Sequence, residues 1–177
     1  MKNLKKHIRS IQDFPEEGVV FRDITTLLKN GPAWQEAVSE LSKPYLQENV
    51  DQIVSMEARG FILGGAMACE LGCGFVPVRK PGKLPAETIE KSYSLEYGTD
   101  TLVMHQDAFE PGDRILMIDD LLATGGTMSA SCELVEELGG EIISCAFLIE
   151  LDFLEGRDKL ESYDIFSLLS YSSEEEM

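Results

Sequence analysis

Residues 115–127 read ILMIDDLLATGGT, and this stretch gives the clearest indication of the fold. The apolar run 115–118 predicts a buried strand, because such a run suits a parallel sheet that is covered on both faces. Asp119 and Asp120 are then expected at the carboxyl end of that strand, where open α/β sheets bind their ligands. A helix is expected over residues 128–138. The stretch therefore predicts an α/β fold with a ligand site at this edge of the sheet.

The turn between the predicted strand and helix has the chemistry of a phosphate site. It consists of small residues: Ala123, Thr124, Gly125, Gly126 and Thr127. Such residues leave the backbone accessible, and the free N–H groups at a helix start attract phosphate. The two carboxylates before the turn would repel phosphate, so their expected partners are sugar hydroxyls or Mg²⁺. A ribose 5-phosphate that carries a pyrophosphate would satisfy all of these groups.

Two other kinds of phosphate loop are excluded by spacing. The nucleoside triphosphatase pattern G-x-x-x-x-G-K-[ST] and the dinucleotide pattern G-x-G-x-x-G occur nowhere in the chain. The remaining alternative is structural: a buried strand, a tight turn and a helix that bind no ligand.

The rest of the chain alternates strands and helices. Strands are expected at residues 52–56, 75–79, 92–97, 101–105, 141–149 and 165–169. Helices are expected around residues 4–11, where Asp13 and Pro15 would end the first, at 32–48 with an interruption near Pro44, and at 61–71. Residues 80–91 contain little apolar material and are expected to form a mobile loop. This alternation predicts a mainly parallel sheet with helices on both faces.

Composition limits the partners and the compartment. The chain has 177 residues, of which 44% are hydrophobic, so we expect a single domain over residues 1–177, with a disordered acidic tail at 172–177. A net charge of −17 would repel a nucleic-acid backbone, so no nucleic-acid partner is expected. No apolar run approaches the roughly 20 residues that span a bilayer, and no signal-peptide core is visible. We therefore expect no membrane association and a cytoplasmic location.

The stretch at 115–127 resembles the signature of the type I phosphoribosyltransferases, enzymes that use 5-phosphoribosyl 1-pyrophosphate. Further segments resemble the adenine-specific subfamily and occur in the expected order: FPEEGVVFRDITTLL (14–28), EARGF (57–61), RKPGKLP (79–85) and YSLEYG (93–98). The resemblance implies the type I fold, with a mainly parallel sheet flanked by helices, a small N-terminal hood that binds the base, and a mobile loop. It also implies a homodimer.

The same resemblance implies an activity, namely transfer of the 5-phosphoribosyl group to adenine to give AMP and pyrophosphate for purine salvage. Arg59 and the backbone N–H of Ala58 would reach the pyrophosphate. Asp119 and Asp120 would hold the ribose hydroxyls and, directly or through water, the cofactor Mg²⁺. The subfamily commonly has a basic residue in the mobile loop where this chain has Pro81, so the loop is not expected to present two cations at that point. Arg79, Lys80 and Lys83 remain available, and Lys83 is the favoured one.

For the base, the resemblance implies that Phe21 stacks on adenine and Leu121 covers the other face. The main chain at Val20 and Arg22 would read the Watson–Crick edge. Without the resemblance, residues 19–21 indicate only an ordinary buried strand. The signature specifies the sugar donor and not the acceptor, so another purine such as xanthine or guanine remains an alternative. A non-catalytic regulator that senses the donor is a further one.

Glu96 would be the acid or base of the reaction. Strand alternation puts it on the opposite face from Leu95 and Tyr97, and the resemblance implies that it faces N7 of adenine and handles the purine proton. Such positioned catalysis typically contributes about 10²- to 10⁴-fold. From the residues alone, Glu96 is an exposed strand carboxylate.

Overall fold

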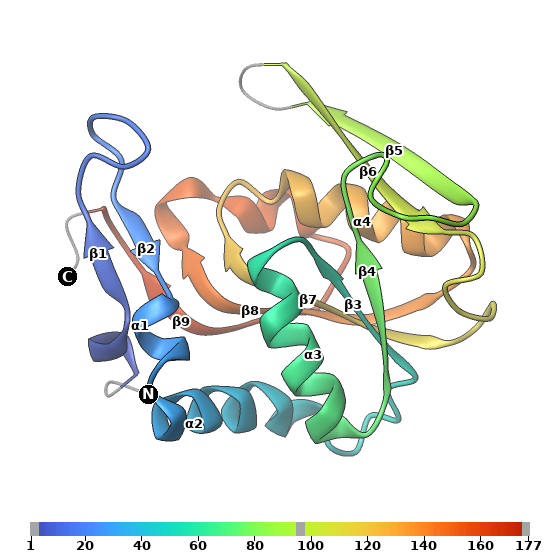
Figure 1. Ribbon diagram of the computed structural model, residues 1–177, viewed down its shortest axis with the longest axis horizontal. Coiled ribbons are helices and arrows are strands. Elements are labelled where there is room, and N and C mark those ends of the chain that lie inside the picture. The colour runs from blue at the N-terminus through green and yellow to red at the C-terminus, as the bar shows by residue number, and fades with distance from the viewer. Residues whose placement is uncertain (1–3, 95–97, 175–177) are drawn as a thin grey trace.

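The computed structural model describes residues 4–94 and 98–174 and has a five-stranded parallel sheet at its centre (Figure 1). The strands lie in the order β4-β3-β7-β8-β9. Their bounds are β3 Gln52–Met56, β4 Gly74–Val78, β7 Arg114–Leu122, β8 Glu141–Leu151 and β9 Ile165–Tyr171. This is the predicted α/β fold.

The central strands are apolar because both faces of the sheet are covered. Ile53 and Val54 of β3 and residues 115–118 of β7 are fully buried. Val54 lies opposite Met117 in the parallel register of these two strands. A continuous apolar run, with no alternating polar residues, is what a strand in the middle of three layers requires.

Helices form the two outer layers. α2, Gly31–Ser42, and α3, Arg59–Leu71, cover one face of the sheet, and α4, Gly126–Glu137, covers the other. The Asn30 side chain caps α2 by accepting a hydrogen bond from the backbone N–H of Ala33 at 3.2 Å. α3 ends at Gly72, whose positive φ of 70° is easily adopted by glycine. Each face therefore has its own apolar core.

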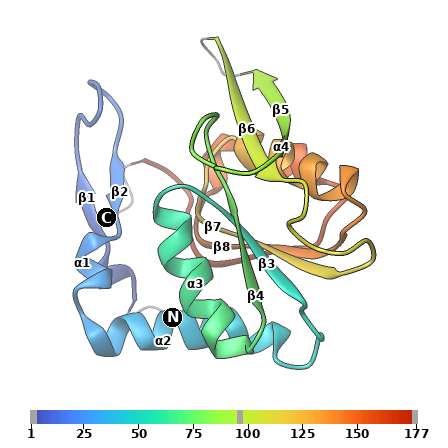
Figure 2. The same ribbon diagram turned by 45° about the vertical axis from the view of Figure 1, so that its right-hand side comes forward.

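Two small antiparallel pairs extend beyond the central sheet (Figure 2). β1, Arg9–Ile11, and β2, Phe21–Asp23, form the N-terminal hood, which is followed by the single-turn helix α1, Thr25–Leu28. β5, Thr88–Ser94, and β6, Thr99–His105, form an arm whose β5 strand contacts α4. Short 3₁₀ helices complete the chain: η1 Lys5–His7, η2 Lys43–Tyr45, η3 Asp152–Leu154 and η4 Gly156–Leu160.

The expected helix around residues 4–11 is wrong. Leu4 and Ile8 are buried as predicted, but only η1 is helical and residues 9–11 are a strand. The reason is a tertiary partner, because these residues pair with β2 and Arg9 forms an ion pair with Asp23 at 2.5 Å. The helix was expected because Leu4, Ile8 and Ile11 are spaced as on one face of a helix, and this spacing alone did not distinguish the two structures.

Other boundaries differ by a few residues. The interruption near Pro44 is confirmed, since α2 ends at Ser42 and η2 contains the proline. β5 begins at Thr88, so the expected loop over 80–91 is shorter than predicted, and the predicted strand 92–97 ends in residues outside the described part of the chain. Within that described part, no helix has the length and apolar character needed to cross a membrane.

Candidate active site

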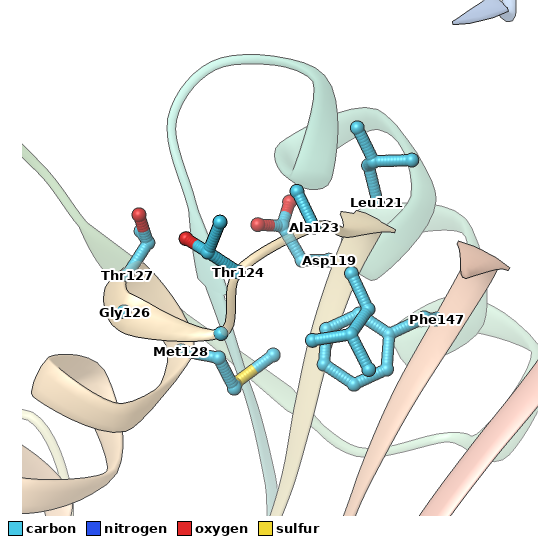
Figure 3. A pocket seen from close by; sticks show the side chains of 10 residues that line it. Asp119, Leu121, Ala123, Thr124, Gly126, Thr127, Met128 and Phe147 are labelled. Atoms are coloured by element: carbon cyan, nitrogen blue, oxygen red, sulfur yellow. The ribbon is translucent and has the colours of Figure 1, made fainter. Parts of the chain in front are cut away.

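The signature stretch folds into one wall of a recess at the carboxyl end of β7. The recess has a volume of about 90 Å³ and opens to solvent. Many of the predicted site residues line it (Figure 3): Asp119, Leu121, Ala123, Thr124, Gly125, Gly126 and Thr127. Leu122, Met128 and Phe147 complete the lining.

The two aspartates were expected just after the strand. They lie within it, near its carboxyl end. β7 continues to Leu122, because β8 runs beside it and Asp119 still lies opposite Phe147 in the parallel register. Successive strand residues point to opposite faces. Asp119 therefore borders the recess, while Asp120 is buried and only 5% exposed.

Arg59, the first residue of α3, compensates the buried carboxylate. Its Nε lies 2.9 Å from Asp120 Oδ2. Burial raises the pKa of Asp120, and the Arg59 guanidinium opposes that rise. Burial and the neighbouring Asp120 carboxylate raise the pKa of Asp119 well above its usual range. A ligand hydroxyl or a cation at these carboxylates would relieve this unfavourable burial of charge.

The same arginine connects the sheet edge with the hood. The Arg59 guanidinium carbon lies 4.9 Å from the centre of the Phe21 ring, within the range of a cation–π contact. Phe14 packs edge-on against Phe21 at 5.2 Å between ring centres. The aromatic residue predicted to stack on a base thus lies next to the charged group predicted to bind pyrophosphate.

The turn after β7 exposes backbone N–H groups. Gly125 has a φ of +77° and precedes α4, whose first-turn N–H groups have no partners within the helix. A Cβ on Gly125 would lie 2.3 Å from the carbonyl oxygen of Gly156, so only glycine fits there. Thr127 contacts Tyr93 of β5, with 3.2 Å between their hydroxyl oxygens. The arm therefore touches the turn at residues 123–127, which we call the phosphate turn because it is the predicted phosphate site.

A glutamate fixes the start of the loop that follows β4. Glu57 accepts hydrogen bonds from Arg79 Nη2 at 2.8 Å and from the backbone N–H of Lys80 at 2.6 Å. Burial acts to raise the pKa of Glu57, but these hydrogen bonds lower it below its usual value. Lys83 is exposed, and its carbonyl accepts a hydrogen bond from Arg79 at 3.2 Å.

The comparisons with known proteins agree with this geometry. Residues 25–173 match the phosphoribosyl transferase domain family. The chain is 57% identical over 171 residues to the adenine phosphoribosyltransferase of Geobacter metallireducens, covering 97% of this chain and all of that one. The chain belongs to the phosphoribosyltransferase family. Within that family it is similar over nearly its whole length to the adenine-specific members.

Solved structures of phosphoribosyltransferases show the same fold. The adenine phosphoribosyltransferase of Thermoanaerobacter pseudethanolicus superimposes with a TM-score of 0.92 at 53% identity, covering 96% of this chain and 99% of that one. The Saccharomyces cerevisiae enzyme, solved in complex with adenine and an imino-altritol bisphosphate, superimposes with a TM-score of 0.90 at 38% identity, covering 95% and 97%. The type I fold expected from the signature is confirmed.

The remaining predicted residues of this phosphoribosyltransferase are less closely grouped. Val20 is half-buried just before β2, and Ala58 is exposed just before α3. The Arg22 side chain is buried and donates a hydrogen bond to Ser10 Oγ at 2.5 Å. Glu96 lies outside the described residues, so its role stays a prediction.

Sequence reasoning missed Gly60, the second residue of α3. A Cβ at this position would lie 2.6 Å from Asp119 Oδ1 and 2.7 Å from Ser55 Oγ. Glycine therefore allows the start of α3 to approach the signature carboxylate. The EARGF segment contained this residue, but no local pattern showed that it would face Asp119. Tyr93 and Glu57 were missed for the same reason, because their contacts join distant segments.

The two aspartates suit a cation that takes most of its ligands from water molecules and from the substrate. Within the described ranges, no group of three or more His, Cys, Asp or Glu side chains is placed to hold a metal. Asp120 Oδ2 is buried without an aligned hydrogen bond, although Arg59 lies beside it. One or two carboxylates with substrate oxygens is the arrangement typical of Mg²⁺ in phosphate sites.

Proposed function

We propose that the chain transfers the 5-phosphoribosyl group from 5-phosphoribosyl 1-pyrophosphate to adenine, releasing AMP and pyrophosphate in purine salvage. The observation that carries this proposal is the convergence of the signature residues on one recess, with Arg59 joining Asp120 to the hood. The names of the full-length relatives support adenine as the acceptor.

Each part of the donor has a matching group. The 5-phosphate binds at the turn Ala123–Thr127, where backbone N–H groups at the start of α4 supply partial positive charge. The ribose hydroxyls bind Asp119 and Asp120. Arg59 and the backbone of Ala58 face the pyrophosphate, and Lys83 comes over it from the loop. The donor is thereby held at both ends with its anomeric carbon between them.

The reaction separates negative charge from an oxocarbenium-like sugar, and the enzyme must stabilise both. Arg59 stabilises the leaving pyrophosphate electrostatically. Phe21 and Leu121 hold the flat base, while the main chain at Val20 and Arg22 reads its edge. Glu96 takes part in removing the purine proton as N9 becomes the nucleophile.

We also propose that Mg²⁺ is required, held through Asp119 and Asp120 directly or through water. When bound, the ion would neutralise part of the charge of the donor. Titration with excess chelator tests this requirement. Activity must fall with chelation and return with added Mg²⁺, and full activity in excess chelator would contradict the proposal.

One assay tests the acceptor. Adenine, hypoxanthine, guanine and xanthine are each supplied with the donor, and pyrophosphate release and the nucleotide product are measured. We expect adenine to have a kcat/KM at least tenfold above the others, a difference that corresponds to about 1.4 kcal/mol. A comparable kcat/KM for another purine would assign the chain to that base instead.

The proposal also covers assembly, partners and location. The chain acts as a homodimer, with contacts from residues 20–28 and from the helix after Arg59, and it contacts neither nucleic acid nor membrane. Its location is cytoplasmic, which suits cysteines that are all free: Cys69, Cys73, Cys132 and Cys145.

A further inference from the structure

The η4 segment lies directly against the phosphate turn. A Cβ on Gly156 would lie 2.2 Å from the carbonyl oxygen of Ala123, and a Cβ on Gly125 would lie 2.3 Å from that of Gly156. The two backbones therefore meet without a side chain between them. Arg157 fixes this segment through hydrogen bonds to the buried Glu150 at 2.6 and 2.7 Å. Residues next to Gly156 are thus held at a defined place beside the turn.

Lys159 is the cation that this arrangement brings to the turn. Its Nζ lies 3.8 Å from the position that a Cβ on Gly126 would occupy, and Gly126 is the first residue of α4. In residues 4–94 and 98–174, Lys159 forms no ion pair or hydrogen bond. Its charge is therefore available to a ligand at the turn.

The neighbouring cations are already compensated by carboxylates. Arg157 is paired with Glu150, Arg59 with Asp120, and Lys80 with Asp100. In a chain with a net charge of −17, an uncompensated ammonium beside exposed N–H groups gives a local positive potential. Lysine commonly binds phosphate in this way, as a point charge on a flexible stem.

We propose that Lys159 is a further binding residue for the 5-phosphate of the donor and of AMP. This inference rests on the proposed function, because that function places a phosphate at the turn. Lys159 adds charge to a site that otherwise depends on backbone N–H groups, and so it favours phosphorylated over unphosphorylated ligands. Because Lys159 Nζ lies beside Gly126, its loss should affect phosphate binding more than adenine binding.

The test compares Lys159→Met with Lys159→Arg and with Lys43→Met. Lys43 is the first residue of η2, its side chain is 69% exposed, and its ammonium lies 3.7 Å from Glu40 Oε1. Its substitution by Met makes the same change in net charge. The dissociation constants of AMP and adenosine are measured by calorimetry, and the KM values of donor and adenine by assay. Thermal unfolding checks that each variant is folded.

We expect Lys159→Met to weaken AMP binding and to raise the donor KM by roughly five- to tenfold, the effect of losing one exposed charge-assisted contact. Adenosine affinity and the KM for adenine should stay within about twofold, Lys159→Arg should restore most of the AMP affinity, and Lys43→Met should match the wild type.

Unchanged AMP affinity in Lys159→Met would overturn the inference, and so would equal losses for AMP and adenosine or an equal effect of Lys43→Met. In those cases wild-type synthesis of AMP would still support the proposed function. A wild-type protein that forms no AMP from adenine and donor would overturn the proposed function itself.

Discussion

Asp120 has a structural contact in the fold and a predicted role in binding the donor. It is buried and contacts Arg59, so Asp120→Asn should lose a charge-assisted contact worth roughly 1.5–3 kcal/mol. We expect donor affinity to fall at least tenfold, with adenine affinity little changed. Thr127→Ala should act in the same direction. Direct titration of each variant with donor and with adenine measures the difference, and donor affinity within twofold of the wild type would make the turn merely structural.

Gly60 gives a second prediction at the same scale. In Gly60→Ala the new Cβ would meet Asp119 and Ser55 at less than 3 Å, so α3 or the carboxylate must shift. We expect a loss of about 1–3 kcal/mol in the free energy of unfolding and weaker donor binding.

Gly65 is the matched control for that substitution. It lies in the same helix, and a Cβ there meets nothing within 4 Å. Gly65→Ala should keep or raise stability by up to about 1 kcal/mol, because alanine favours helix over glycine. Urea unfolding and donor titration of both variants measure the two effects. Equal behaviour of the variants would contradict the role given to Gly60.

Glu96 is tested by kinetics. If it handles the purine proton, Glu96→Gln keeps the shape but loses proton exchange, so kcat should fall at least tenfold with donor affinity nearly unchanged. A role limited to binding the base would raise the KM for adenine and leave kcat intact. Measuring both constants separates these readings, and a variant with wild-type constants would leave Glu96 as an exposed carboxylate.

At the scale of elements, the Glu150–Arg157 pair joins the end of β8 to η4. The hydrogen bonds from Arg157 lower the pKa of Glu150 from its ordinary 4.5. A lowered native pKa contributes stability above the unfolded value, and this contribution disappears as the pH falls through the native value. Glu150→Gln should therefore be less stable than the wild type at pH 7, by roughly 1.5 kcal/mol since Arg157 is half exposed.

The difference between the two proteins should shrink as the pH falls below 4.5, because the unfolded chain takes up a proton at Glu150 at a higher pH than the native protein does. Urea unfolding of wild type and variant from pH 7 to pH 3 tests this. A stability difference that stays constant over that range would show that the pair contributes through packing and not through charge.

The elements also show how far local pattern reaches. The predicted bounds of β3 match the structure to the residue. The segment is mostly apolar and too short for a typical helix, so a buried strand was the favoured assignment. The turn before α4 was predicted from the small residues 123–127, and a helix was predicted after them. β1 and η4 were missed because their conformations depend on partners elsewhere in the chain. The pairing of Arg9 with Asp23 and the contact of Gly156 with Gly125 are examples.

The site residues also fall into those that a local stretch predicts and those that only the fold brings together. Most of the predicted residues of one continuous stretch line one recess: Asp119, Leu121 and residues 123–127. Asp120, from the same stretch, is buried on the opposite face of β7. Arg59 was assigned by resemblance, and its contact with Asp120 is a finding of the structure. Gly60, Tyr93 and Lys159 could not be identified locally, because each contacts residues of the recess from a separate segment of the chain.

At the scale of the whole molecule, the expected dimer contact can be tested at an exposed apolar side chain of α3. Ile62 on α3 is 48% exposed, one turn beyond Arg59 in the region expected to form the interface. We expect sedimentation at micromolar concentration to show a species of twice 19.7 kDa. Burial of a single large apolar side chain contributes about 1.5–3 kcal/mol, so Ile62→Asp should shift the equilibrium towards monomer.

Leu46 is the control for that measurement, since it is 61% exposed and lies after η2, outside the expected interface. Leu46→Asp should sediment as the wild type does. A wild-type protein that sediments only at 19.7 kDa would refute the dimer.

The backbone contact between Gly125 and Gly156 has a consequence for how the sequence can vary. Neither position has space for even a methyl group, and the obstacle at each is main-chain carbonyl oxygen, which no choice of rotamer can move aside. Gly125 and Gly156 are far apart in the sequence, but both are restricted to glycine by the same close contact between two backbone segments. In a saturation library under selection, both positions should tolerate glycine alone. A second substitution at the partner position should not rescue the first, because every residue type keeps the carbonyl oxygen that causes the clash.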